Sequence, residues 1–373
     1  MMKINPFQME RWQSTWEHRV ELNLSESGVH PMTPAELLEL GEVDPGELLR
    51  QRLGYNQSNG SDDLRASIAR LYPGAGPENV LVTNGGSEAN FVTTWSLFEP
   101  GATVVMQTPN YMQMWGQAET FAREVRSFRL VEERSWSPDL DELRDRAKGA
   151  SAIIVTNPNN PTGSILSEDE IDEIVGIADG AGAWIIADEI YAGAELDEAA
   201  SPTFWGRYDR LIVTAGLSKA YGLPGLRVGW ALGPPDVVED IWAYKDYTTI
   251  APGVLSDFCA RVALTPTTRQ RIRERTRSIL LENLPTITTW LDRRPDIFSF
   301  VPPRAGAICY ARYELDIGSS EIARRLKDEH SVLIVPGDHF HMDGYVRIGY
   351  GLPRPELLEG LNRIETLVRS LSG

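Results

Sequence analysis

The sequence predicts an α/β protein in which a three-layer domain surrounds a mostly parallel β-sheet and a smaller α+β unit follows. Two observations support the larger domain. Short apolar runs rich in β-branched residues recur between positions 79 and 232, and helical stretches separate them. After position 295, short strand-like pieces again alternate with helices, which predicts the smaller unit.

The composition restricts the class of protein. Of 373 residues, 42% are hydrophobic and the formal net charge is −17, which is typical of a soluble globular protein and argues against nucleic acid or an anionic membrane as a partner. The N-terminal residues lack the apolar core of a signal peptide, and no run approaches the ~20 apolar residues of a membrane span. Cys259 and Cys309 lie in apolar contexts, so we expect core residues and no disulfide framework. These features predict a cytoplasmic protein.

The expected elements follow from the period of the apolar residues. An aromatic helix at 6–20 should pack on another surface, because Phe7, Trp12 and Trp16 lie on one side of it. Residues 21–31 should be extended and end in a turn, and residues 236–293 should be mostly helical. The other strands are expected at 79–83, 103–107, 152–156, 183–188, 211–214, 226–232, 307–313, 332–335 and 345–350, and the other helices at 62–71, 167–182, 319–329 and 355–370, with one more starting at Ser87.

A glycine turn joins the strand at 79–83 to the helix that starts at Ser87. Gly85 and Gly86 allow a tight turn, and such a turn points bare N–H groups and the positive end of the helix dipole at one place. This arrangement suits a phosphate, although strand–glycine–helix turns are common in α/β folds. Neither a Walker A motif nor a GxGxxG fingerprint after a strand is present.

Two buried strands end in polar residues. The strand at 152–156 runs into N-P-N-N-P-T-G, which by itself indicates only a loop. Ser167, with Glu170 three residues later, then predicts a capped helix start. Asp188 ends the next apolar strand, where an unpaired carboxylate would be costly, so we expect it to have a cationic partner.

A lysine stands in the loop between the predicted strands at 211–214 and 226–232. Lys219 is one of only five lysines, and the other four stand at the N-terminus or among polar helical residues. Burial would lower the pKa of its amine and free it to form a Schiff base with a carbonyl compound. The alternative is a lysine that reaches solvent from the loop.

Residues 218–230, S-K-A-Y-G-L-P-G-L-R-V-G-W, resemble the cofactor-lysine segment of the class I/II aminotransferases, the fold-type I pyridoxal-phosphate enzymes. N-P-N-N-P-T-G and the D-x-x-Y pattern from Asp188 to Tyr191 are similar to two further motifs of that family. The resemblance implies an aspartate aminotransferase-like fold and the cofactor pyridoxal 5′-phosphate. It also implies a large domain at 46–284, and a small domain with an N-terminal arm formed by 1–45 and 285–373.

The resemblance implies a role for each matching residue. Lys219 would carry the cofactor and act as the base, and Asp188 would keep the ring nitrogen protonated; both are the expected catalytic residues. Arg347 would clamp the substrate carboxylate, with Asn160 and Gly28 as further substrate-binding residues. The expected cofactor-binding residues are Gly86, Ser87, Tyr111, Asn160, Asp188, Tyr191, Ser218, Lys219, Arg227 and, from a neighbouring subunit, Tyr55.

One residue departs from the family pattern, because Gly216 stands where many members have a phosphate-binding serine, although Ser218 remains. Tyr55, five residues before Gly60, matches a tyrosine that reaches the neighbouring subunit's phosphate, so the resemblance implies a homodimer with sites at the interface. The alternative is a turn aromatic that packs locally.

The expected reaction is transamination between an L-amino acid and a 2-oxo acid. S-G-V-H at 27–30 and R-I-G-Y-G-L-P-R-P-E-L at 347–357 also resemble a subgroup of the family, the capreomycidine synthases, which use the same cofactor for elimination and cyclisation of a hydroxyarginine. A lyase or cyclase is therefore the alternative, and a non-enzymatic regulator is a third. Glu26 would favour a basic substrate side chain only if it faces the site. D-H-F-H-M-D at 338–343 matches no zinc signature, and we expect no metal.

Overall fold

The computed structural model describes residues 4–372, in which the strands form sheets of eight, four and two strands. Strands β3, β4, β6, β7 and β8 pair in parallel, while β9 runs antiparallel to both β8 and β2, so that six strands share one direction. The expected mostly parallel sheet is thereby confirmed. Across the large sheet the order is β2 (Val80–Thr83), β9 (Gly229–Leu232), β8 (Leu211–Gly216), β7 (Trp184–Asp188), β6 (Ala152–Thr156), β3 (Thr103–Thr108), β4 (Glu124–Val131) and β5 (Ser137–Pro138).

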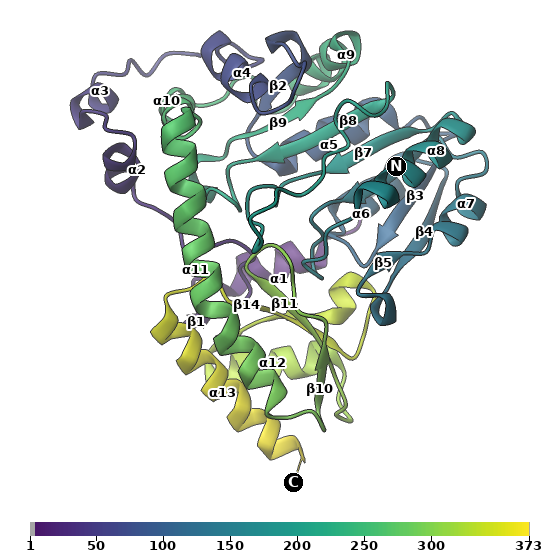
Figure 1. The fold of residues 1–373 in the computed structure, drawn as a ribbon, viewed down its shortest axis with the longest axis vertical. Helices are drawn as coiled ribbons and strands as arrows, with labels where there is room; N and C mark the ends of the chain where they lie inside the picture. Colours follow the sequence, from purple (N-terminus) through teal and green to yellow (C-terminus); the bar gives the residue numbers. More distant parts are fainter. Residues whose placement is uncertain (1–3, 373) are drawn as a thin grey trace.

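Helices cover both faces of this sheet, because successive residues of its buried strands point to opposite sides (Figure 1). In β6, Ile153 and Val155 pack in one core cluster with α7 (Leu140–Arg146) and α8 (Glu168–Ala181). Ile154 points the other way and packs with α6 (Gln113–Phe121). On that same face, α5 (Gly86–Leu97) and α9 (Pro235–Lys245) cover β2, β8 and β9. The three layers are those expected.

The smaller sheet is antiparallel and lies below the large one in Figure 1. Its strand order is β10 (Phe298–Phe300), β11 (Ile308–Tyr313), β14 (Tyr345–Gly349) and β13 (Val335–Pro336). The long α11 (Pro266–Asp292) runs from the upper part of the molecule down to this sheet (Figure 1). The α+β unit is completed by α12 (Ser319–His330) and α13 (Arg354–Ser372).

The N-terminal segment lies between the two sheets (Figure 1). Its helix α1 (Gln8–Trp16) is followed by β1 (Leu22–Asn23), which pairs in parallel with β12 (Val332–Leu333). The other helices are α2 (Pro34–Leu40), α3 (Pro45–Leu49), α4 (Asp62–Ala69) and α10 (Val254–Ala263).

Several expected boundaries differ from those observed. Strand β9 begins at Gly229 rather than near 226, because Arg227 has a left-handed backbone with φ 51° after a short 3₁₀ turn. Strand β4 was not expected, since its charged residues obscure the apolar pattern.

The capping box at Ser167 and Glu170 is confirmed. Both cysteines are free and buried, as expected. The domain division stays a prediction; its boundary at 284 lies within α11, and residues 1–3 and 373 lie outside the described part. Across residues 4–372 we find no helix that combines the length and apolar character needed to span a membrane.

Candidate active site

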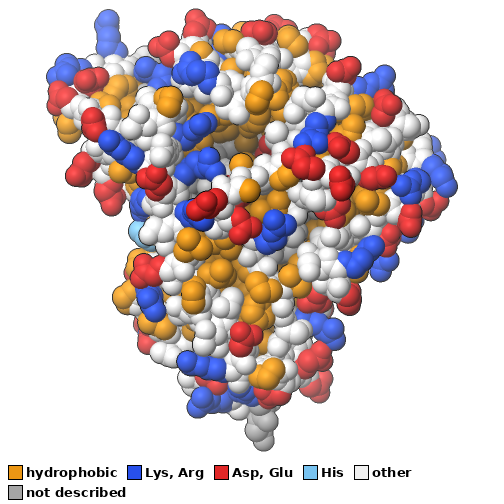
Figure 2. Space-filling model, viewed as in Figure 1, with side chains coloured by type: hydrophobic (Ala, Val, Ile, Leu, Met, Phe, Trp, Pro, Cys, Tyr) orange, Lys and Arg blue, Asp and Glu red, His pale blue; other side chains and the backbone are white. Residues whose placement is uncertain are grey.

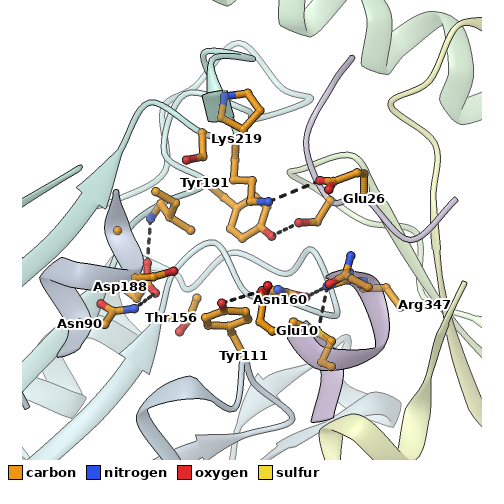
Figure 3. A pocket seen from close by; sticks show the side chains of 18 of the residues that line it. Glu10, Glu26, Asn90, Tyr111, Thr156, Asn160, Asp188, Tyr191, Lys219 and Arg347 are labelled. Atoms are coloured by element: carbon orange, nitrogen blue, oxygen red, sulfur yellow. Dashed lines mark hydrogen bonds and ion pairs between the residues drawn. The ribbon is translucent and has the colours of Figure 1, made fainter. Parts of the chain in front are cut away.

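A cavity of about 280 Å³ lies at the carboxyl ends of β3, β6, β7 and β8, and the N-terminal segment with Glu10 and Glu26 closes one side of it (Figure 3). Parallel strands bring residues that are distant in sequence to one sheet edge, which is where ligands bind in open α/β sheets. Tyr55 and Gly28 do not line the cavity. Ten of the predicted site residues do: Gly86, Ser87, Tyr111, Asn160, Asp188, Tyr191, Ser218, Lys219, Arg227 and Arg347.

Lys219 follows β8 and points into the cavity, with Nζ 3.8 Å from Glu26 Oε2 (Figure 3). Burial lowers the pKa of its ammonium, but Glu26, Tyr191 and Glu10 together outweigh burial and raise this pKa above its usual value. The expected lowering of the lysine pKa is therefore wrong, because carboxylates of the N-terminal segment face the amine.

Asp188 ends β7 and is only 5% exposed. Its carboxylate accepts hydrogen bonds from Asn90 Nδ2 and from the backbone N–H of Ile190, each at 3.1 Å. Burial nevertheless raises the pKa of Asp188 to about 6, although both donors and Lys219 oppose this shift. Among the described residues, no cationic side chain forms an ion pair with it. The described side chains therefore do not supply the cationic partner that we expect for Asp188, which leaves the cavity as the place for such a partner.

The glycine turn brings the start of α5 against Arg227. Gly85 has φ 88°, and a Cβ built on it would lie 2.4 Å from Arg227 Nη2. A Cβ on Gly229 would lie 2.4 Å from the carbonyl carbon of Gly85, so only glycine permits this approach of β9 to the turn. Arg227 Nη1 donates to the Pro224 carbonyl, and within residues 4–372 this guanidinium has no carboxylate partner.

Gly216 has a structural explanation. A Cβ built on it would lie 2.8 Å from the carbonyl oxygen of Val228 and 3.1 Å from Cα of Gly229. A serine at this position would therefore require a shift between β8 and β9. Ser218 lines the cavity two residues later and offers a hydroxyl there.

Arg347 lies on β14 with 1% exposure and connects the small sheet to the large one. Nη1 donates to Asn160 Oδ1 at 2.7 Å, and Nη2 donates to the carbonyl oxygen of Ser25 at 2.6 Å. Its buried Nε has no hydrogen-bond partner among the described residues. Burial lowers the pKa of this guanidinium.

Two tyrosines of the site hold the N-terminal segment over the cavity. Tyr111 donates its hydroxyl to Glu10 Oε1 at 2.8 Å, and Tyr191 donates to Ser27 Oγ at 2.8 Å. Phe7 also packs edge-on against Tyr111, with ring centroids 5.0 Å apart. The segment thus forms one wall of the cavity.

Three carboxylates on this wall form what we call the acid wall: Glu10, Glu17 and Glu26. Glu26 does face the site, so the condition for favouring a basic side chain is met (Figure 3). Burial and the neighbouring Glu26 raise the pKa of Glu17. The sequence analysis missed Glu10 and Glu17, although Glu10, Gln13, Ser14 and Glu17 follow the i, i+3, i+4, i+7 spacing of one helix face. Asn90 was also missed; it lies one turn after Ser87 on α5.

The remaining predicted residues lie elsewhere. Gly28 packs behind the lysine, where a built Cβ would be 3.5 Å from Lys219 Cδ, and its substrate role stays a prediction. Tyr55 is 93% exposed on the surface. Lys245 ends helix α9, as expected for one of the helical lysines, but its side chain is buried. Within residues 4–372, no group of three His, Cys, Asp or Glu is arranged to hold a metal ion, and the absence of a metal stays a prediction.

The comparisons with known proteins indicate one family of enzymes. The model of the family "Aminotransferase class I and II" matches residues 42–364. Capreomycidine synthase of Streptomyces vinaceus is 31% identical over 367 residues, which is 95% of this chain and 92% of that protein. A solved PLP-dependent aminotransferase from Streptococcus suis superposes with a TM-score of 0.93 at 33% identity over 99% of both chains. The PLP-dependent cyclase OrfR superposes with a TM-score of 0.89 at 27% identity, over 99% of this chain and 98% of that one.

Proposed function

This chain belongs to the aminotransferase class I and II family, and we propose that it transfers the amino group of an L-amino acid with a cationic side chain to a 2-oxo acid. Its cofactor is pyridoxal 5′-phosphate. The observation that carries the proposal is that Lys219 and the buried Arg347 line one cavity. A reactive amine and a guanidinium that can bind a carboxylate with two hydrogen bonds can therefore contact the same substrate molecule.

The residues present fit this cofactor. Asp188 offers a carboxylate whose pKa is raised by burial and which forms no ion pair with a described side chain, so it suits a protonated ring nitrogen. Gly86 and Ser87 begin a twelve-residue helix whose N-terminus has no side-chain cap, and Arg227 lies beside the turn without a carboxylate partner in the described part of the chain. These groups and Ser218 would hold the phosphate, and Tyr111, Asn160 and Tyr191 would contact the ring and its oxygen.

Each residue has a definite task in this proposal. When bound, pyridoxal 5′-phosphate supplies an electron sink that stabilises negative charge at the α-carbon of an amino acid. Asp188 keeps the ring nitrogen protonated, and Arg347 orients the amino acid through its carboxylate. Lys219 Nζ would take the proton from the α-carbon and deliver it to the C4′ carbon of the cofactor, which is the proton movement that transamination requires. The N-terminal segment excludes water from one side of the site, because Tyr111 and Tyr191 hold it there.

The acid wall is the reason for proposing a substrate with a cationic side chain. Glu26 Oε2 lies 3.8 Å from Lys219 Nζ, and with Tyr191 and Glu10 it keeps the pKa of that ammonium high, which opposes its action as a base. A substrate ammonium or guanidinium beside Glu26 would replace the lysine as the partner of this carboxylate. Lys219 would then be more easily deprotonated, so that binding of the cation and activation of the base would coincide.

The second candidate is a lyase or cyclase reaction on a hydroxylated amino acid. Elimination expels a group from the β-carbon and needs a proton donor beside it. Glu17 lines the cavity and has a raised pKa, so it is a candidate donor. The likeness to capreomycidine synthase and to the cyclase OrfR also favours this candidate.

Absorbance of the bound cofactor distinguishes the two reactions. Purified protein would be titrated with aspartate, phenylalanine, norleucine and arginine. A change that a 2-oxo acid reverses identifies transamination, whereas ammonia release without that exchange identifies elimination. We expect arginine to react fastest, and Glu26→Gln to lower its kcat/KM about tenfold while norleucine changes less than about twofold. Glu39→Gln, an exposed change of equal charge, serves as the control. An equal loss for arginine and norleucine would contradict the role of the acid wall.

A further inference from the structure

Glu88 lies in the first turn of α5, where the helix dipole favours a carboxylate, but this turn is also the proposed site of a negatively charged phosphate. Its Oε2 accepts a hydrogen bond from the backbone N–H of Asn84 at 2.6 Å, immediately before the glycine turn. Gly85 and Gly86 have much conformational freedom, so a turn made of them needs outside contacts to hold one geometry. Glu88 supplies such a contact at the entry to the turn.

The other oxygen of Glu88 connects α5 to an exposed loop, residues 246–251. Oε1 accepts hydrogen bonds from the hydroxyls of Thr248 at 2.5 Å and Thr249 at 2.7 Å. The side-chain amide of Asn84 also donates to the Thr249 hydroxyl and to the carbonyl oxygen of Ala251. The carboxylate therefore joins the loop and the turn through two different oxygens.

The loop itself is held in a strained geometry by Lys245. This buried ammonium donates to the carbonyl oxygens of Ile250 at 2.5 Å and Ser58 at 2.8 Å. Ile250 has φ 63°, which is a rare backbone conformation for a β-branched residue and needs support from its surroundings. Burial lowers the pKa of Lys245, and Glu88 opposes that shift. Lys245 thus holds the far end of the loop, and Glu88 joins the loop to the turn.

Simple electrostatics would disfavour this arrangement, because a carboxylate at a helix N-terminus repels a phosphate bound there. The contacts to Asn84, Thr248 and Thr249 give a reason for its presence. We propose that Glu88 is a positioning residue for the phosphate-binding turn and that it couples the order of loop 246–251 to affinity for the cofactor phosphate. The proposal rests on the phosphate site proposed above, whereas it is independent of the reaction that follows.

Glu88 could act by positioning the turn or only through its negative charge, and the two interpretations predict opposite changes in the affinity for pyridoxal 5′-phosphate. Apo-protein would be titrated with pyridoxal 5′-phosphate and with pyridoxal, which lacks the phosphate, and binding followed by absorbance and intrinsic fluorescence. If Glu88 positions the turn, Glu88→Gln weakens pyridoxal 5′-phosphate about tenfold, because one charge-assisted hydrogen bond is lost, and pyridoxal changes less than about twofold. If Glu88 acts only by its charge, Glu88→Gln tightens pyridoxal 5′-phosphate binding, and that result overturns the proposal, as does an unchanged affinity.

Thr249→Val tests the coupling to the loop, because it removes a donor to Glu88 without a change of charge or shape. We expect a loss of pyridoxal 5′-phosphate affinity in the same direction, and an unchanged affinity overturns the coupling. Glu99→Gln is the matched control, since it removes a carboxylate that is exposed on the same part of the chain. Arg227→Ala tests the proposed phosphate site by itself. If this variant leaves the ratio of the affinities for pyridoxal 5′-phosphate and pyridoxal unchanged, the proposed phosphate site is wrong. If only the Glu88 and Thr249 variants leave that ratio unchanged, the inference about Glu88 alone fails.

Discussion

Two adjacent carboxylates at the end of β7 have different surroundings. Asp188 lines the cavity, whereas Glu189 points away from it and accepts hydrogen bonds from the Thr203 hydroxyl and the Phe204 N–H. Burial raises the pKa of Asp188 to about 6 and that of Glu189 to about 7. Burial thus raises the pKa of both carboxylates. At Asp188 the raised pKa bears on the proposed reaction, and at Glu189 it bears on the stability of the fold.

We expect Asp188→Asn to bind the cofactor but to lower turnover by at least about a hundredfold, or about 3 kcal/mol. An amide cannot keep the ring nitrogen protonated, so negative charge at the α-carbon is less stabilised. Cofactor absorbance and steady-state rates test this expectation. Near-normal turnover with the cofactor bound would mean that Asp188 is structural.

Glu189 makes stability depend on pH. Its pKa in the folded state, about 7, lies above the ordinary value of 4.5, so the folded protein retains a proton that the unfolded chain has lost. Stability from this group is therefore present at low pH and decreases as pH rises from about 4.5 to about 7, with a total effect of about 3 kcal/mol. We expect Glu189→Gln to unfold at higher denaturant concentration than the wild type at pH 8, with the difference disappearing near pH 4.5. A difference that does not change with pH would contradict this expectation.

Arg347→Lys keeps the charge but loses the planar fork. We expect amino acids to lose about 2 kcal/mol of transition-state binding, because a lysine recovers only part of two charge-assisted hydrogen bonds. Plain amines without a carboxylate should be almost unaffected, so the ratio of the two kcat/KM values is the measurement. If both kinds of substrate weaken equally, Arg347 does not bind the carboxylate.

At the scale of elements, α1 is one wall of the site and is held by contacts on both its polar and its aromatic side. Trp12 Nε1 donates to the carbonyl oxygen of Ile334 at 2.9 Å, and Gln13 Nε2 donates to the carbonyl oxygen of Ser25 at 2.8 Å. The packing of Trp12 therefore helps to hold the polar face of the helix, with Glu10 and Glu17, toward the cavity.

We expect Trp12→Ala to loosen α1 selectively, because it removes the hydrogen bond to Ile334 and the contacts with His339 and Lys327 from a helix of nine residues. Limited proteolysis should then cut near the N-terminus, and KM for a cationic amino acid should rise about tenfold, or about 1.4 kcal/mol, with the melting temperature nearly unchanged. Arg11→Ala, on the exposed side of α1, is the control. A variant as resistant to proteolysis as the wild type would exclude this view of α1.

At the scale of the whole molecule, exposed apolar side chains gather near Tyr55, which does not reach the cavity of its own chain. Leu49, Leu53 and Tyr55 are exposed on one stretch, and Tyr247 and Ile250 on the loop that Lys245 joins to it. Figure 2 shows one face of the molecule, with charged groups spread among its apolar side chains. A second copy of the chain that covered this stretch would bury these groups.

We therefore expect a homodimer in which Tyr55 reaches the partner's phosphate site. Light scattering gives the mass, and Tyr55→Phe should weaken pyridoxal 5′-phosphate about fivefold more than pyridoxal, since one hydrogen bond to the phosphate is lost. A monomer that is fully active and saturated with cofactor would disprove both the dimer and the role of Tyr55.

The sequence, with the family resemblance that it carries, determined the fold and about half of the residues that line the cavity. Asp188 ends a buried apolar strand, and Asn160 and Lys219 come after two others. Parallel pairing brings such strand ends to one edge, which agrees with the single site that the resemblance implies. The glycine turn can be predicted locally in the same sense, because Gly85 and Gly86 permit it, although contacts from Glu88 and Arg227 surround it in the fold.

Tertiary structure alone decided how these groups are charged and which faces they meet. The pKa of Lys219 rises because Glu26 and Glu10, nearly two hundred residues away in sequence, face its amine. Lys245 is buried because the carbonyl groups of Ser58 and Ile250 lie within reach of its ammonium. Helix α1 has an aromatic side and a polar side, and its period does not say which side meets the small sheet and which meets the cavity. Electrostatic energies depend on distances between atoms in space, and those distances exist only once the separate segments have packed together.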